Sequence, residues 1–253
     1  MVLLEMKKTE GLSPNQERIM GILEYKNIDI ITKNELLLLI ERYMKVKDPI
    51  DLIEKLLKKR KLVLIKKGIY MIMPFTAIDK KWSLDEQRFV DYLLKDNYYI
   101  GLYNAFNMHH FTEQIPNKLF VFNTKYSFDK NILSLKFKFF KIKKEKLFGI
   151  TKEYKYPYSD KERTIIDALE YPIYLGRLNN VIERIKDSKY DKKKLIDYAI
   201  RYNSIKIMKI IGYLTKSPKI YRILKKREKL DYYTTVNRTG MNVMDKKWKI
   251  RLI

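Results

Sequence analysis

Cysteine is absent from the 253-residue sequence, which excludes disulfides and thiolate zinc sites. No apolar run approaches the roughly 18 residues that a membrane-spanning helix needs, and the N-terminal apolar stretch is too short for a signal peptide. We therefore expect a cytoplasmic protein with no membrane partner. The two histidines, His109 and His110, are adjacent. On a helix they would point roughly 100° apart and cannot bind one metal together, so we expect no metal site and no cofactor.

Acidic residues are scarce, since 54 Lys and Arg stand against 30 Asp and Glu, a net charge of +24. This charge concentrates polyanions near the protein at low salt, so nucleic acid is the first partner to consider. A lysine-rich proteome would give the same count without any binding, and the position of the charges must therefore be examined. With 46% hydrophobic residues, the chain should fold around a sizeable core.

Helix-start and turn signals in residues 1–76 predict three short helices followed by a β-hairpin. Ser13-Pro14 begins the first helix, Thr32 and Glu35 form a capping box for the second, and Asp48-Pro49 begins the third. Two β-favouring runs follow, separated by Lys67-Gly68. This is the order of a winged helix-turn-helix. We therefore expect an α+β protein whose first domain binds DNA.

Basic residues concentrate where the third helix and the hairpin would meet a duplex, with nine basic against three acidic residues from 45 to 67. The helix would enter the major groove and the hairpin would contact phosphate. The alternatives are a solvated basic helix or a winged helix used for protein contact. Because lysine positions a protein on phosphates more than it discriminates bases, sequence specificity is weakly supported. The candidate DNA contacts are Lys45, Lys47, Lys55, Lys58, Lys59, Arg60, Lys66 and Lys67.

A second, mixed α/β domain ending in helices is expected over residues 82–253, after a boundary near 76–82. Ser83 and Glu86 form the capping pair that would open it. Its expected elements are a helix near 102–109, a strand over 119–123, two helices within 191–214, one further helix and a terminal strand. Asn203 separates the two helices, because asparagine tolerates a helix end.

The segment "LSLKFKFFKIKK" (residues 133–144) changes the phase of its alternation, which predicts a β-bulge near Phe139 and Phe140. Its lysines would form a second basic surface. That surface would contact nucleic acid, dock an acidic partner or simply face solvent. Its residues are Lys136, Lys138, Lys141 and Lys143.

The charged stretch "SDKERTIIDAL" (residues 159–169) predicts a helix start rather than an active site. Ser159 stands three residues before Glu162, a capping-box spacing, and Arg163 and Asp167 are four apart, an ion-pair spacing. No partner with a shifted pKa is indicated for acid–base chemistry. Three aromatic residues near the C-terminus, Tyr232, Tyr233 and Trp248, are expected in a small core rather than stacked on bases.

The stretch 159–185 resembles a segment of AbiEi-type antitoxins, the transcriptional-regulator halves of type IV toxin–antitoxin systems. Residues 56–72, 98–124 and 194–214 are similar to further stretches of that family, in the same order. The chain departs from the family where paired glycines and an Arg-Leu-Gly-Tyr run are usual. At those places it has Gly176-Arg177 and, over 210–213, "IIGY".

The resemblance implies a DNA-binding autorepressor that is not an enzyme. Its winged helix would occupy inverted repeats in its own promoter, with two copies meeting as a homodimer on double-stranded DNA. Its C-terminal domain would counter a nucleotidyltransferase-like toxin. The resemblance gives Lys55, Lys58, Lys59, Lys66 and Lys67 as operator contacts.

Two rival functions remain open from the sequence. Asp129 with Glu153 and Lys155 is similar to the metal-binding acids and lysine of restriction-type nucleases, although Asp129 lacks the usual preceding proline. The second rival is a protein-interaction module whose basic sheet grips an acidic toxin and which has no DNA function.

Overall fold

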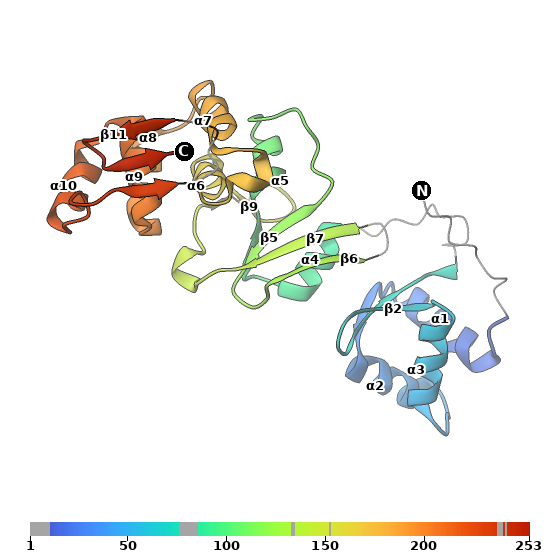
Figure 1. Cartoon of the computed structure of the whole chain (residues 1–253). Coiled ribbons are helices and arrows are strands. Elements are labelled where there is room, and N and C mark those ends of the chain that lie inside the picture. The colour runs from blue at the N-terminus through green and yellow to red at the C-terminus, as the bar shows by residue number, and fades with distance from the viewer. Residues whose placement is uncertain (1–10, 76–85, 133–134, 152, 237–239, 241) are drawn as a thin grey trace. The chain divides into compact units, whose positions relative to one another are not determined.

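A computed structural model describes residues 11–75, 86–132, 135–151, 153–236, 240 and 242–253. The chain forms two compact units, 1–92 and 93–253, and each is described by itself. Helices and β-sheets occur in the fold, which confirms the α+β class (Figure 1). The boundary expected at 76–82 and the cap expected at Ser83 lie outside the described residues. Within the described part, no helix has the length and apolar character to cross a membrane.

The first unit has the three helices and the hairpin that the signals predict, together with a short strand, β1, that they did not predict. Its sheet is antiparallel, with strand order β1-β3-β2. The elements are α1 (Pro14–Tyr25), β1 (Ile30–Thr32), α2 (Lys33–Tyr43), α3 (Pro49–Lys58), β2 (Leu62–Lys66) and β3 (Ile69–Ile72).

The expected helix starts of this unit are confirmed by their hydrogen bonds. The Thr32 hydroxyl accepts from the Glu35 amide at 3.2 Å, and the Glu35 carboxylate accepts from the Thr32 amide at 2.8 Å. The Asp48 carboxylate caps α3 by accepting from the amides of Ile50 and Asp51. These contacts satisfy backbone N–H groups that have no partner within the helix.

One apolar core holds the three helices of the first unit against its sheet. Each helix contributes a buried stripe at helical spacing, and the strands contribute the residues that face the helices. The stripe residues are Ile19 and Leu23 from α1, Leu36 and Ile40 from α2, and Leu52, Ile53 and Leu56 from α3.

The second unit contains a six-stranded sheet, several helices and a small sheet near the C-terminus. The large sheet has the order β6-β7-β5-β4-β9-β8. Its strands are β4 (Tyr98–Ile100), β5 (Leu119–Asn123), β6 (Phe128–Ile132), β7 (Leu135–Lys141), β8 (Ile150–Thr151) and β9 (Tyr158–Ser159). The helices are α4 (Glu86–Leu94), which spans the division between units, α5 (Leu102–Met108), α6 (Lys161–Glu170), α7 (Leu178–Lys186), α8 (Lys192–Tyr202), α9 (Ile205–Thr215) and α10 (Pro218–Lys226). Two short 3₁₀ helices lie at Lys144–Lys146 and Pro172–Leu175.

The predicted bulge at Phe139 and Phe140 is wrong. Strand β7 pairs in continuous register with β5 on one side and β6 on the other. The phase change arises because both faces of β7 bury aromatic rings. Phe139 stacks on Phe128 on one face, whereas Phe140 stacks on Phe122 on the other, with ring centroids 4.1 Å and 4.7 Å apart.

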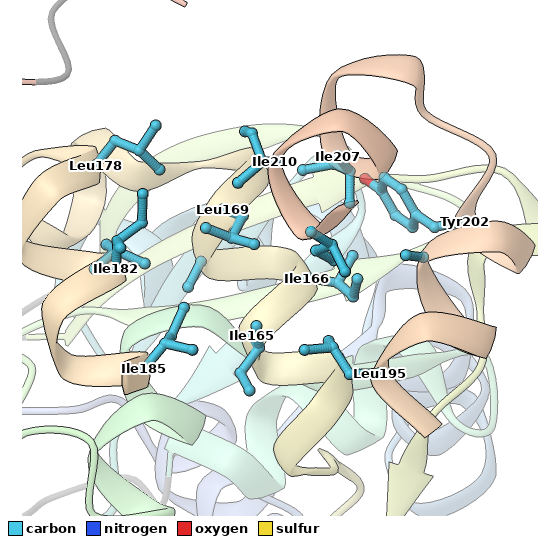
Figure 2. Packing of buried hydrophobic residues seen from close by; sticks show 14 of the residues in the cluster. Ile165, Ile166, Leu169, Leu178, Ile182, Ile185, Leu195, Tyr202, Ile207 and Ile210 are labelled. Atoms are coloured by element: carbon cyan, nitrogen blue, oxygen red, sulfur yellow. The ribbon is translucent and has the colours of Figure 1, made fainter. Parts of the chain in front are cut away.

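Helix α6 lies at the centre of the second unit's core, and every residue from 162 to 169 is buried. Its apolar side chains Ile165, Ile166 and Leu169 pack among residues from the three following helices (Figure 2). Those partners are Leu178, Ile182 and Ile185 from α7, Leu195 and Tyr202 from α8, and Ile207 and Ile210 from α9. The helix that begins in "SDKERTIIDAL" is therefore the structural centre of this unit.

The last three strands form a small sheet of order β10-β12-β11 (red in Figure 1). They are β10 (Thr234–Val236), β11 (Val243–Asp245) and β12 (Ile250–Leu252). The expected terminal strand is thus confirmed, and so is the helix end at Asn203, whose φ is +57°. Trp248 is 1% exposed and packs edge-to-face against Tyr221. Its expected place in a core is confirmed, whereas the same expectation is wrong for Tyr232, which is 49% exposed.

Candidate nucleic-acid interface

The solvent face of α3 is divided along its length. The buried stripe of Leu52, Ile53 and Leu56 leaves two acids exposed, Asp51 and Glu54, followed by two exposed lysines, Lys55 and Lys58. Asp51 ion-pairs with Lys55 at 2.7 Å. Lys58 is exposed at the end of the helix. Within α3 the two acids balance the two lysines, so the excess positive charge lies at the end of the helix and in the three basic residues 59–61 that follow it.

Lys59 differs from its neighbour, because its ammonium group is already used within the protein. Its Nζ donates to the Gly11 carbonyl at 2.8 Å and to Gln16 Oε1 at 3.1 Å. These bonds tie the end of α3 to the start of α1. Arg60 follows in a left-handed conformation, with φ at +57°, and its side chain is exposed. Lys45 and Lys47 are exposed in the loop between α2 and α3.

The tip of the β2–β3 hairpin carries the other predicted contacts. Lys66 and Lys67 are exposed there, beside Gly68, whose φ of +75° lets the chain reverse tightly. The Lys33 amide donates to the Gly68 carbonyl at 2.8 Å, which pins the tip to the start of α2. A surface hollow of about 540 Å³ lies between them. It is lined by Thr32, Lys33, Asn34, Leu64, Lys67, Gly68 and Tyr70.

The structure does not bring the lysines of β7 onto one surface. Lys136 and Lys138 have the same parity and share a strand face with Phe140, whereas Lys141 is on the opposite face and Lys143 lies beyond the strand. Lys138 is also engaged, since its Nζ lies 3.5 Å from Asp129 and 5.7 Å from the ring of Phe140.

The residues of the nuclease hypothesis are separated by the whole sheet. Asp129 lies on β6 and Glu153 follows β8, and these strands form opposite edges of the six-stranded sheet, about 24 Å apart over five strand spacings. Asp129 contacts Lys118 at 2.8 Å, and this hydrogen bond lowers the pKa of its carboxyl. No group of three His, Asp or Glu side chains that could hold a metal ion occurs in the described residues.

The predicted capping role of Ser159 is wrong, because Asp160 is the N-cap of α6. The Asp160 carboxylate accepts from the Arg163 amide at 2.8 Å. Ser159 is instead the last residue of β9, and its hydroxyl lies 2.8 Å from that of Thr164. Asp160 is also a better acceptor for an N-terminal amide than a neutral hydroxyl.

Glu162 does not reach back to close a capping box. Its carboxylate accepts from the Asp191 amide at 2.9 Å and lies 3.0 Å from Lys194 Nζ. Lys194 also contacts Asp160 at 3.2 Å. The acids at the start of α6 therefore hold the start of α8, which explains their presence without catalysis.

Arg163 and Asp167 form a fully buried pair with Tyr99. Arg163 Nε donates to Asp167 at 3.1 Å, its Nη2 donates to the Tyr99 hydroxyl at 2.7 Å, and that hydroxyl donates to Asp167 at 3.0 Å. Rings of Phe148 and Tyr202 lie 4.7 Å and 5.0 Å from the guanidinium carbon. Burial raises the pKa of Asp167, and Arg163 opposes this effect. The predicted ion pair is confirmed as a structural one.

The two histidines have different surroundings. His109 Nε2 lies 2.8 Å from the Ser159 carbonyl, which joins the end of α5 to β9. Burial lowers the pKa of His109, so the neutral ring donates this hydrogen bond. His110 is exposed, in a left-handed conformation with φ at +61°.

Comparison with known proteins finds a likeness of fold. A crystal structure of the RV2827C protein from Mycobacterium tuberculosis matches with a TM-score of 0.63 over 96% of this chain and 93% of that one. Sequence identity is 12%, so the likeness concerns the fold alone. A scan against protein-family models finds no match, and a search of curated proteins finds none.

Most of the positive charge lies outside the predicted DNA-binding domain. Residues 1–92 hold 18 Lys and Arg against 14 Asp and Glu, whereas residues 93–253 hold 36 against 16. The imbalance is steepest at the C-terminus, where residues 192–253 hold 18 against four. A charge count over residues 45–67 alone misses this concentration. Counting along the whole chain would have found it.

Proposed function

We propose that this protein is a cytoplasmic, non-enzymatic DNA-binding regulator, the autorepressor and antitoxin of a type IV toxin–antitoxin system. The observation that carries the DNA-binding part is the exposed basic set at the end of α3 and at the hairpin tip. Lys58, Arg60 and Lys67 are exposed and have no hydrogen-bond or ion-pair partner among the described residues. Free ammonium and guanidinium groups are suited to phosphate contact.

The winged-helix interpretation is supported by the order α1-β1-α2-α3-β2-β3 and by the strand order β1-β3-β2. The divided face of α3 refines the proposed contact. Its first half presents Asp51 and Glu54, which repel phosphate. We therefore propose that the last turn of α3 and the hairpin contact the backbone, and that Lys59 stabilises the unit instead.

The antitoxin part of the proposal rests on the resemblance of four ordered stretches to AbiEi-type proteins. Several residues of the central stretch, including Arg163, Thr164 and Asp167, are buried. A nucleotidyltransferase-like toxin would therefore not contact them. Countering the toxin would depend on other surfaces, or on repression of its gene.

Two assays test the proposal. The first is a gel shift of the full chain on a duplex from upstream of its own gene, with a shuffled duplex as the control. Incubation of the chain with plasmid and Mg²⁺ accompanies it as a test for nuclease activity. We expect a shift that depends on inverted repeats, two copies per operator, and uncut plasmid. The second co-expresses the chain with the adjacent gene. No operator shift, or no rescue from a toxic neighbour, would refute the corresponding half of the proposal.

A further inference from the structure

The exposed charged residues of helix α10 are all basic. Its buried side is formed by Ile220 and Leu224, and the helix contains no acidic residue. Lys219 pairs with Asp197 at 2.6 Å, whereas Arg222, Lys225 and Lys226 have no ion-pair partner among the described residues. Arg222 stands three positions from Lys225 and four positions from Lys226.

Like charges at these spacings destabilise a helix by a few tenths of a kcal/mol for each pair. Acidic residues on the same face would remove this repulsion by forming ion pairs. An ion pair of that kind joins Asp51 to Lys55 on α3. The face of α10 is thus matched to an external anion rather than to the rest of the protein.

Two consecutive tyrosines follow this helix, and each is flanked by cations. Tyr232 is 49% exposed and lies 5.0 Å from Lys209 Nζ and 5.6 Å from Lys229 Nζ, measured to the ring centroid. Tyr233 lies 5.0 Å from Lys249 Nζ.

The backbone around these tyrosines is fixed by a buried lysine. Lys209 is 0% exposed, and its Nζ donates to the Tyr232 carbonyl at 2.8 Å and to the Lys249 carbonyl at 3.2 Å. It links α9 to the entry of β10 and to the residue before β12. The tyrosines are therefore held on an ordered base rather than on a free tail.

Tyr233 belongs to the outer face of the small sheet. Ile250 and Leu252 of β12 are buried, whereas Arg251 between them is exposed. Arg251 is paired in register with Thr235 and Met244, which are also exposed. By alternation along β10, Tyr233 shares the side of Thr235, and Arg251 lies 5.8 Å from its ring.

We propose that the basic face of α10, Tyr232–Tyr233 and the outer face of the small sheet form one binding surface for an unpaired nucleic-acid strand. The cations would contact successive phosphates and the two tyrosines would stack on bases. Tyr232 is exposed and Tyr233 is half-buried, and aromatic rings interleaved with lysines are the arrangement that binds single strands, since every base has a π-face. A duplex hides those faces, and an acidic peptide has none, so neither would use the tyrosines.

The test measures binding of the full chain to fluorescent single-stranded RNA and DNA of mixed sequence, and to the operator duplex. We expect Tyr232→Leu and Tyr233→Leu each to weaken single-strand binding about 10-fold. Tyr25→Leu is the matched control, because Tyr25 is 86% exposed in the first unit, and it should change nothing. Arg222→Gln with Lys226→Gln should lower the salt slope for single strands by about 1.4, which is 0.7 for each phosphate contact.

The proposal and the proposed regulator function fail separately. If the unaltered chain bound single strands but did not shift the operator, only the regulator function would be refuted. The tyrosine variants should bind the operator as the unaltered chain does. Single-strand affinity that is unchanged in both tyrosine variants would overturn the present inference. Equal losses on duplex and single strand would also overturn it.

If the tyrosine variants fail to fold, crosslinking of the unaltered chain decides the question. An oligonucleotide carrying 5-iodouracil should attach to the tryptic peptide that begins at Leu230. Attachment confined to other peptides would contradict the proposal.

Discussion

Arg163 is a residue whose spacing from Asp167 is visible in the sequence and whose surroundings are not. The i,i+4 spacing predicts an ion pair on a helix. The spacing does not predict the contact with Tyr99, which lies 64 positions away and accepts a hydrogen bond from Arg163 Nη2. Nor does it predict that the two side chains are buried, to about 1% exposure. Burial changes the energetics, because an exposed pair contributes a few tenths of a kcal/mol, whereas breaking a buried one leaves an uncompensated charge.

Replacement of Asp167 by Asn should lower the free energy of unfolding by about 3 to 5 kcal/mol, since Arg163 would keep its charge without a counter-ion. Urea denaturation measures this. The double variant Arg163→Met with Asp167→Leu should be more stable than the single variant, because no charge is left unpaired. If the double variant lost as much free energy of unfolding as the two single variants lose together, the two residues would not act as a pair.

His109 gives the molecule a pH-dependent stability. Burial lowers the pKa of His109 below that of the unfolded chain, so the folded state binds fewer protons. Stability should therefore fall as pH decreases below about 6.5 and level off below the folded-state pKa. His109→Gln should flatten the melting temperature between pH 7.5 and 5, relative to the unaltered chain. His110→Gln, at the exposed neighbouring position, should leave the slope intact; the opposite pattern would contradict this assignment.

At the scale of elements, helix starts and turns were the most predictable features. The signals at Ser13-Pro14, Thr32, Asp48-Pro49 and Asn203 act through bonds within a few residues, so the local sequence contains them. Ser159 failed as a cap because Asp160 competes for the same amide. The bulge at Phe139 failed because alternation assumes one buried face, whereas β7 has aromatic partners on both, and those partners come from distant segments.

Gly212 on α9 allows the indole of Trp248, which lies between β11 and β12, to pack closely against the helix. A Cβ at this residue would lie 2.2 Å from Trp248 Cζ3, so the indole that anchors the small sheet occupies the space of the missing side chain. Gly212→Ala should lower the free energy of unfolding by about 1 to 3 kcal/mol, through displacement of Trp248. Trp fluorescence and urea denaturation measure both effects.

Gly21→Ala is the matched control, since it is exposed on α1 and a Cβ there would have no neighbour within 4 Å. That change should raise the free energy of unfolding by about 1 kcal/mol through helix propensity. If Gly212→Ala were equally stabilising, the close packing of Trp248 on α9 would be wrong.

At the scale of the whole molecule, composition indicated an anionic partner but not where it would bind. The α+β class followed from the order of elements, because that order can be read locally. The candidate site could be predicted only as a set of lysines. The structure distinguishes the two neighbouring lysines, because Lys59 donates hydrogen bonds to Gly11 and Gln16 whereas Lys58 is exposed. The sequence alone does not show which of the two is free to bind DNA.

The division of charge between the two units sets the expectation for binding. With 18 Lys and Arg against 14 Asp and Glu in residues 1–92, the first unit has only a small excess and should bind duplex DNA through a few placed contacts. The second unit should contribute most of the non-specific attraction, which is strongly dependent on salt. The substitutions that separate the two kinds of binding are therefore those at the placed contacts, at Lys58 and Lys67 for the duplex and at the two tyrosines for a single strand.

The central claim is that Lys58 and Lys67 contact the phosphates of a duplex. The most direct measurement is the slope of log K against log [salt] for the operator duplex. Each change, Lys58→Ala and Lys67→Ala, should reduce the magnitude of the slope by about 0.9, and Lys59→Ala should leave it unchanged. Slopes for Lys58→Ala and Lys67→Ala equal to that of the unaltered chain would contradict the account.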